Sequence, residues 1–472
     1  MAKKKPSTTP PGNEIDPWAE HEFGHVPFTD KRLEKRVKKI ATNFARLPTG
    51  SIPQASGNWA NSKAAYRLFD NEAVSDEEIL ENHLLATVER TRAETIVFAI
   101  QDTSSLNYTT HPATTGLGPI NNNADKTKGL FAHTTLIVTP SGVPMGILDE
   151  QIQARDEAKY GDSKKRNSKP IEEKESVRWL DSFRTTEQLA DMLPETQVVV
   201  IADREADIYE LLVEAAENQN RLGLLVRAQH DRGVAHEEKR LWKALHSQPE
   251  SAKIAVEIPG GNGRKPRTAI LSIRFCPVTV KAPLLKKEQA PVSLWAVEAL
   301  EENAPSGVSA LCWKLLTTVA VATAKDAIER VQWYKQRWLI ELFHKILKSG
   351  CKIEARQLQT AERLKKCAAI DLVVAWRILY LTTLSRYTPN APSSGFLAEH
   401  EWKALYCYIH RTNQPPAKAP DLRQAVRWIA QLGGFLGRKG DGDPGPITLW
   451  RGIRRLEDIA AAYLVFNPST CG

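Results

Sequence analysis

The sequence predicts a mixed α/β fold, in which strands and helices alternate in the middle of the chain and helices occupy both ends. An apolar run from Thr95 predicts a buried strand that leads directly into Asp102. Residues 131–152, "FAHTTLIVTPSGVPMGILDEQI", predict two strands joined by a Pro-Ser-Gly turn. Residues 197–217, "QVVVIADREADIYELLVEAAE", predict a strand that ends in an acid and leads into a helix. This order of elements is typical of a mixed α/β core.

The elements before this core are predicted to be helices. Asp30 is an N-cap candidate for a helix over residues 31–47, and a second short helix fits residues 61–71. Ser75 precedes a third helix, and Glu78 follows three residues later, which is the spacing of a capping box.

The elements after residue 217 continue the alternation. Strands are predicted at residues 222–229 and 312–319, on either side of a β-rich stretch at about 236–310. A long helix is predicted to hold residues 334–350, and mostly helices follow it.

These elements divide the chain into four parts. Residues 1–14 are rich in Lys, Pro and Thr and are predicted to be a disordered tail. Residues 15–90 form a helical domain, and residues 91–384 form the α/β core with its β-rich insertion at about 236–310. Residues 385–472 are predicted to be a helical C-terminal domain.

The composition limits the class of protein. The chain has 472 residues and a net charge of +8, which favours an anionic partner. The sequence contains no run of about 18 apolar residues, so we expect no membrane span. None of the six cysteines forms a Cys-x-x-Cys pair, so we expect reduced thiols in a cytosolic protein rather than a zinc knuckle or redox motif.

Two acids are placed where ligands of open α/β sheets collect, at the ends of strands. Asp102 and Asp203 each end an apolar strand. Asp203 also opens a helix, so an N-cap role is an alternative for it.

The helix over residues 334–350 contributes a third acid. Tyr334, Arg337, Glu341 and Lys348 are spaced so that a continuous helix holds them within a stripe roughly 60° wide. Such a stripe is often a solvated salt-bridge ladder. It can also bind phosphate and metal together.

The three carboxylates favour a hard divalent cation. Asp102, Asp203 and Glu341 would repel one another if they met, and Mg²⁺ prefers oxygen ligands. Paired metal ions serve phosphoryl transfer in many enzymes. Arg337 and Lys348 would then bind the non-reacting phosphates.

At this point the chain resembles a family, the DDE transposases of bacterial cut-and-paste insertion sequences. It is similar to the group with the signature Y-x2-R-x3-E-x6-K, which includes the transposase of the composite kanamycin-resistance transposon. All four signature positions are met at the required spacing. Further matches are "QDTSSLNY", "ADREADIY", "EKESVRWL", "AYRLFDN" and "LGGF", which together span nearly the whole chain after the tail.

The resemblance implies a ribonuclease H-like catalytic core in which Asp102, Asp203 and Glu341 hold Mg²⁺, with Mn²⁺ as a substitute. It implies an N-terminal DNA-binding domain and a C-terminal domain that pairs two protomers into a homodimer. The partners would be the terminal inverted repeats of the element and target DNA. The reaction would proceed through strand cleavage, formation and opening of a hairpin, and strand transfer. A bacterial cytoplasmic, nucleoid-associated location follows.

The resemblance also implies contacts with the hairpin. Tyr334, Arg337 and Lys348 would contact its phosphates. Trp313 stands where the family has a tryptophan that receives a flipped base, and stacking on an aromatic is worth roughly 1–3 kcal/mol. A core aromatic is the alternative for Trp313.

Other positions match DNA contacts of the family. Arg227 matches a phosphate contact, Lys345 is a further expected DNA contact, and Arg36 and Arg67 match positions that touch end DNA. Asp70 departs from the resemblance, since the similar transposase has an arginine there. The end sequence that the family recognises therefore does not carry over.

Two further readings compete with the main one. A relative that binds DNA without cutting it, or a stand-alone nuclease of the same fold, would share most of these motifs. "HEFGH", from His21 to His25, matches the zinc-protease motif, but Gly24 within it makes a helix with both histidines on one face doubtful.

Overall fold

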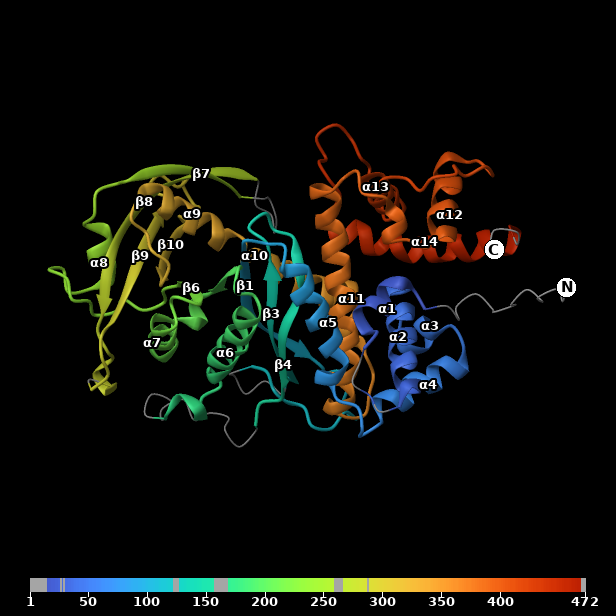
Figure 1. Cartoon of the computed structure of the whole chain (residues 1–472), viewed down its shortest axis with the longest axis horizontal. Coiled ribbons are helices and arrows are strands. Elements are labelled where there is room, and N and C mark those ends of the chain that lie inside the picture. Colours follow the sequence, from blue (N-terminus) through green and yellow to red (C-terminus); the bar gives the residue numbers. More distant parts are fainter. Residues whose placement is uncertain are drawn as a thin grey trace.

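The computed structural model describes residues 15–25, 28, 30–121, 127–156, 169–258, 266–286 and 288–467. The predicted tail over 1–14 lies outside these residues. The centre is a ten-stranded mixed sheet with strand order β2-β3-β1-β5-β6-β10-β9-β8-β7, with β4 also paired to β3 (Figure 1). The strands are β1 (Ile96–Asn107), β2 (Gly118–Pro119), β3 (Lys128–Val138), β4 (Pro144–Gln153), β5 (Gln197–Ala202), β6 (Leu222–Arg227), β7 (Ala252–Ile258), β8 (Arg267–Val280), β9 (Val292–Leu300) and β10 (Cys312–Thr317).

The helices lie on both faces and at one end of the sheet. They are α1 (Pro17–Phe23), α2 (Lys31–Arg46), α3 (Ile52–Ser56), α4 (Trp59–Phe69), α5 (Asp76–Thr91), α6 (Val177–Met192), α7 (Tyr209–Glu217), α8 (Leu241–His246), α9 (Ala324–Lys335), α10 (Trp338–Lys345), α11 (Ala361–Tyr387), α12 (Glu399–His410), α13 (Leu422–Leu432) and α14 (Pro446–Phe466). Figure 1 shows α1–α4 and α12–α14 beyond α11, at the end opposite to β7–β9.

The predicted caps of the N-terminal helices are confirmed. The Asp30 side chain accepts a hydrogen bond from the Arg32 amide at 2.8 Å and so begins α2. Ser75 and Glu78 exchange the two hydrogen bonds of a capping box and begin α5. Helix α5 then packs on β4 so closely that a Cβ on Gly146 would lie 1.8 Å from Thr87 Oγ1.

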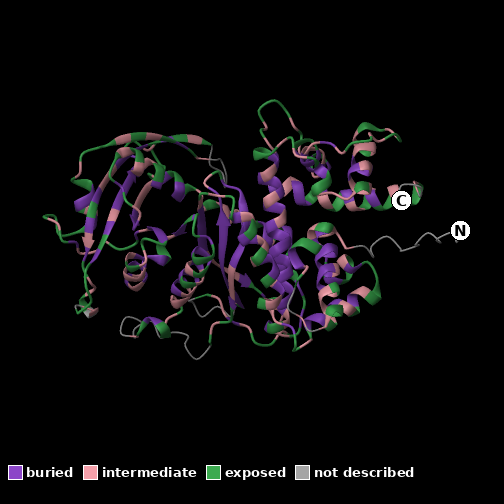
Figure 2. Ribbon diagram, in the orientation of Figure 1, coloured by how far each residue is buried: buried purple, intermediate pink, exposed green. Residues whose placement is uncertain are grey.

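The sheet has a separate apolar core on each face, because successive side chains of a strand point to opposite sides. Phe98 and Ile100 of β1 face the core that α10 and α11 cover. Val97 and Ala99 face the core that α6 and α7 cover. Figure 2 shows the buried residues concentrated in the central strands and in α11.

The β-rich stretch predicted at 236–310 extends the same sheet. Strands β7, β8 and β9 pair in sequence, and β9 pairs antiparallel to β10, which in turn pairs with β6 of the central group. The inserted strands are therefore continuous with the strands that carry the acids.

The prediction of one continuous helix over residues 334–350 is wrong. Helix α9 ends at Lys335, α10 begins at Trp338, and residues 346–350 form a π turn in which the Cys351 amide donates to the Ile346 carbonyl at 2.9 Å. The Gln336 side chain, at the break, donates to the Pro140 carbonyl in the β3–β4 turn at 3.0 Å. The apolar spacing continues through both interruptions, so periodicity gave no sign of them.

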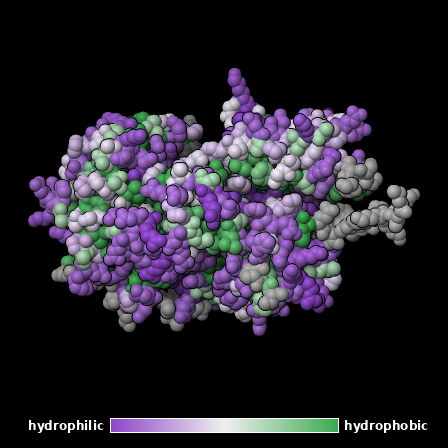
Figure 3. Space-filling model, viewed as in Figure 1, coloured by the Kyte–Doolittle hydropathy of each residue, from purple (hydrophilic) through white to green (hydrophobic). Residues whose placement is uncertain are grey.

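Helix α11 is a core helix. It is long and apolar enough to cross a membrane by length and composition alone, but 83% of its most apolar window is buried inside the protein. Hydrophilic side chains cover most of the face shown in Figure 3, with small apolar patches between them.

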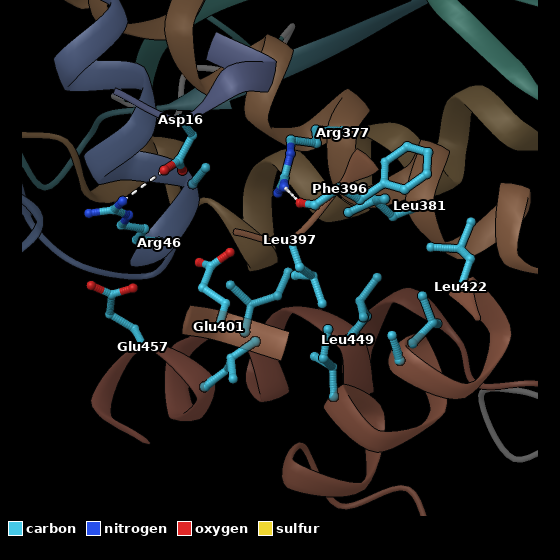
Figure 4. A pocket seen from close by; sticks show the side chains of 16 residues that line it. Asp16, Arg46, Arg377, Leu381, Phe396, Leu397, Glu401, Leu422, Leu449 and Glu457 are labelled. Carbon is cyan, nitrogen blue, oxygen red and sulfur yellow. Dashed lines mark hydrogen bonds and ion pairs between the residues drawn. The ribbon is translucent and has the colours of Figure 1, made fainter. Parts of the chain in front are cut away.

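A hollow lies between the N-terminal and C-terminal helices (Figure 4). Asp16 pairs with Arg46 at 2.7 Å, and Arg377 donates to the Phe396 carbonyl at 2.9 Å. Burial raises the pKa of Glu457 in its wall to about 7. Its lining comes from α2, α11, α12, α13 and α14 and from the residues before α1 and α12, so we assign it to the contact between the two helical parts.

Candidate active site at the strand ends

The strand register brings the two aspartates together. Strands β1 and β5 are parallel neighbours, and their last paired residues are Gln101 and Ala202. Asp102 and Asp203 are the next residues along each strand. Asp203 also accepts a hydrogen bond from the Glu205 amide at 2.8 Å, so the N-cap prediction is confirmed for the short 3-10 turn Arg204–Ala206. That bond occupies one carboxyl oxygen, Oδ1. Helix α7 begins only at Tyr209, so Asp203 does not cap that helix.

Helix α10 brings the third acid to the same place. Arg337 donates from Nη2 to Glu341 Oε1, and its Nη1 lies 3.9 Å from Asp102 Oδ2. The guanidinium therefore lies between two of the three carboxylates. His344 Nδ1 also lies 3.9 Å from Asp102 Oδ2.

The electrostatics of Asp102 reflect this gathering of acids. Burial, opposed by Arg337 and assisted by the nearby Asp203 and Glu341 carboxylates, raises the pKa of Asp102 to about 7. The three carboxylates thus interact without metal, and Arg337 is the cation that compensates them in part.

This donor set fits a hard divalent cation. Asp102, Asp203 and Glu341 offer only carboxylate oxygens, and a cation among them would relieve both the burial of Asp102 and the mutual repulsion. Within the residues that the structure describes, no three metal-ligating side chains are already close enough to hold an ion. Glu341 would have to exchange Arg337 for the cation.

We expect Asp102→Asn to stabilise the metal-free protein at pH 8 by about 1–3 kcal/mol. The folded protein binds the Asp102 proton more tightly than the unfolded chain, so stability falls as pH rises from about 4 to about 7. Asparagine removes this penalty. Urea unfolding with a chelator, at pH 8 and at pH 4.5, measures the gain, which should shrink at the lower pH. Asp181→Asn, on the exposed face of α6, is the control, and an equal gain there would contradict the explanation.

A second group of predicted residues lies beside the carboxylates. Arg227 ends β6 and donates to the Cys312 carbonyl at 2.9 Å. Trp313, on the neighbouring β10, contacts Tyr334 edge-to-face, with ring centroids 5.5 Å apart. Burial raises the pKa of Tyr334, which is only 5% exposed, and the Arg337 and Arg227 guanidinium groups oppose that rise. Trp313 is half-buried. Its ring neighbour Tyr334 is itself one of the residues expected to contact the hairpin.

The remaining predicted DNA contacts are dispersed. Lys345 is exposed on α10, and Lys348 lies in the π turn, close enough to lower the pKa of His344. Arg36 lies on α2 and Arg67 on α4, at the far side of α11 from the strand ends (Figure 1).

Asp70 has a partner within the chain. It pairs with Arg363 in the first turn of α11, 293 residues away. An arginine at this position would face Arg363. This pairing gives a structural reason for the departure at Asp70.

The histidine-rich "HEFGH" motif serves the packing of α1. Helix α1 ends at Phe23, with Gly24 as its cap, so His25 is not on the helix. Glu22 is buried and bonds to His83 at 2.6 Å and to Arg90 at 2.7 Å. These bonds outweigh burial and lower the pKa of Glu22, which is a structural carboxylate.

Sequence reasoning missed several residues at this site. Trp338, at the start of α10 and three residues before Glu341, is 61% exposed, which is unusual for a tryptophan. His344, Thr134 and Glu150 lie behind Asp102. The three-residue spacing from Glu341 could have placed Trp338 at the site. The positions of His344, Thr134 and Glu150 behind Asp102 depend on strand pairing, which the sequence does not give.

Three domain families match the chain. Residues 15–74 match the family described as "Transposase DNA-binding", residues 181–370 match "Transposase DDE domain", and residues 373–465 match "Transposase Tn5 dimerisation domain". The matched stretch of the DDE domain contains Asp203 and Glu341 but begins after Asp102.

Solved structures that are similar include one described as "Cryo-EM structure of piggyBac transposase synaptic complex with hairpin DNA". The identity is 11% and the TM-score is 0.31, and the match covers 66% of this chain and 52% of the other. The match thus spans about half the length of that solved chain.

Proposed function

This chain belongs to the DDE transposases, and from that membership we propose that it moves an insertion sequence by cutting and rejoining DNA at the ends of the element. The observation that supports the proposal is that Asp102 and Asp203 follow neighbouring parallel strands, while Arg337 lies between Asp102 and Glu341. The sequence of steps is strand cleavage, hairpin formation, hairpin opening and strand transfer.

Asp102, Asp203 and Glu341 would hold Mg²⁺, with Mn²⁺ as a substitute. When bound, such ions activate the attacking oxygen and stabilise the leaving oxygen of a phosphodiester. With Glu341 bound to the cation, Arg337 would be free to bind a phosphate, for which its forked guanidinium is suited. Tyr334 and Arg227 beside the carboxylates, Lys345 on α10 and Lys348 in the π turn would contact neighbouring phosphates.

The partners are DNA and a second copy of this chain. The helical part over 15–90, with Arg36 and Arg67 on its surface, binds the terminal inverted repeats, and the part over 385–472 pairs two protomers on them. The matches to a DNA-binding and a dimerisation family support these two assignments. Target DNA is the final acceptor, in a bacterial cytoplasm.

The experiment is cleavage of a plasmid that carries the element's own ends, with and without Mg²⁺. Hairpin-ended fragments that require the metal support the full proposal. Binding of the ends without any cleavage, in Mg²⁺ or Mn²⁺, would identify a catalytically silent relative instead. Metal-dependent cleavage at unrelated sequences would identify a stand-alone nuclease.

We expect Trp313→Ala to slow hairpin formation by about 10- to 100-fold while first-strand nicking changes little, because a flipped base loses its stacking surface. Trp313→Phe, which keeps an aromatic face, should recover most of the rate. Single-turnover assays on end-labelled DNA separate the two steps. Equal slowing of both steps would assign Trp313 to the core instead.

A further inference from the structure

A row of polar side chains crosses the sheet behind Asp102. Asp102 of β1 is paired with Thr134 of β3, and Thr134 is paired with Glu150 of β4. Residues directly opposite one another on neighbouring strands project from the same face of a sheet. The three side chains therefore form one line across the face on which α10 packs.

His344 of α10 packs on this line of side chains, with one ring nitrogen near Thr134 and the other near Asp102. Thr134 Oγ1 lies 2.6 Å from Glu150 Oε2 and 3.3 Å from His344 Nε2. The other ring nitrogen, Nδ1, lies 3.9 Å from Asp102 Oδ2, about 1 Å beyond a hydrogen bond. Thr134 is fully buried and His344 is 7% exposed, so bulk water does not compete for these contacts.

The position of the protons follows from the far end of the line. Glu150 Oε1 is buried and has no hydrogen-bond partner in the described part of the chain, and burial raises the pKa of Glu150 to about 8. A neutral Glu150 donates to Thr134, whose hydroxyl then donates to His344 Nε2. An imidazole ring that accepts this hydrogen bond at Nε2 carries its proton on the other nitrogen. That proton is on Nδ1, which faces Asp102.

We propose that His344 is a positioning residue that orients the Asp102 carboxylate, and that Thr134 and Glu150 set its tautomer. The proposal rests on the proposed function, in which Asp102 holds a divalent cation. Partners of this kind behind a metal ligand are commonly worth 10- to 100-fold in metal affinity.

The test measures the affinity of the full chain for Mn²⁺ in the absence of DNA, by electron paramagnetic resonance. Thr134→Val keeps the volume and removes the hydroxyl, and we expect about tenfold weaker binding. Thr134→Ser keeps the hydroxyl and should restore it. Thr135→Val is the matched control, because Thr135 is a fully buried neighbour whose Oγ1 has no hydrogen-bond partner among the residues described. Mn²⁺ binding by Thr134→Val at the wild-type level would overturn the proposal.

Glu150 gives a second, independent comparison. Glu150→Gln keeps a neutral hydrogen-bond donor of the same shape, and we expect binding within about threefold of wild type, whereas Glu150→Leu should bind about tenfold more weakly. If Glu150→Gln binds as weakly as Glu150→Leu, Glu150 acts through its charge and the assigned proton order is wrong. Circular dichroism melts confirm that each variant is folded.

The outcomes separate this inference from the proposed function. Wild-type protein that binds Mn²⁺ but cuts no DNA contradicts the transposition reaction, while the effect of Thr134→Val on Mn²⁺ binding still tests His344. Normal cleavage by wild type together with unchanged Mn²⁺ binding in Thr134→Val overturns only the role of His344.

Discussion

Glu341→Gln is expected to reduce strand cleavage at least about 1,000-fold while binding to the element's ends stays close to wild type. The amide keeps the shape of the side chain but loses the negative charge that a divalent cation requires, and the metal contributes several kcal/mol to such reactions. Arg337 loses its carboxylate partner in α10 but keeps Asp102 within 3.9 Å, so the fold of the site should persist. Gel-shift and plasmid-cleavage assays on the same preparation measure the two effects.

Glu329→Gln is the control for this substitution. Glu329 lies on α9, in the same stretch of chain, and pairs with Arg330 away from the strand ends. The Glu329→Gln variant should cut DNA at the wild-type rate. Cleavage by Glu341→Gln at a similar rate would remove Glu341 from the set of metal ligands.

Asp371→Ala is expected to lower the free energy of unfolding by about 3–5 kcal/mol, because it leaves a buried arginine without its partner. Arg356 bonds to both carboxyl oxygens of Asp371, at 2.6 and 2.8 Å, and both side chains are almost wholly buried. Arg356 also donates to the Gly50 carbonyl at 2.6 Å and lies over the Phe44 ring. This pair therefore joins α11 to the N-terminal helices.

Urea unfolding measures the loss. The double variant Arg356→Met, Asp371→Leu removes both charges together and should recover most of the stability, since apolar pairs of similar volume often replace buried ion pairs. Asp30→Ala, which breaks the exposed pair with Arg32, should cost about 1 kcal/mol through the lost cap. A loss below about 1 kcal/mol in Asp371→Ala would show that Arg356 finds other partners.

Features set by neighbouring residues could be predicted from the sequence. The caps at Asp30 and Ser75 depend on residues two and three positions away, and the strands that end at Asp102 and Asp203 are marked by their own apolar runs. The family resemblance supplied the assignment of Glu341 to the same site. The chemical roles of these acids stay predictions.

Features set by distant pairing could not be predicted. The line from Glu150 to Asp102 depends on the register of three strands, and shifting one strand by a single residue would turn its side chains to the other face. Asp70 finds its partner 293 residues away, at Arg363. The break between α9 and α10 was also hidden, because the apolar spacing runs through it without interruption.

Helix α11 limits how this protein can be divided or recombined. The match to the DDE domain ends at residue 370 and the match to the dimerisation domain begins at 373, but α11 runs without interruption from Ala361 to Tyr387. Asp371, the partner of Arg356, falls in the interval between the two matches. The two domains therefore share helix α11 and have no linker between them. A chimera that exchanges one of these domains between relatives therefore has to keep α11 intact, together with the turn that bears Arg356.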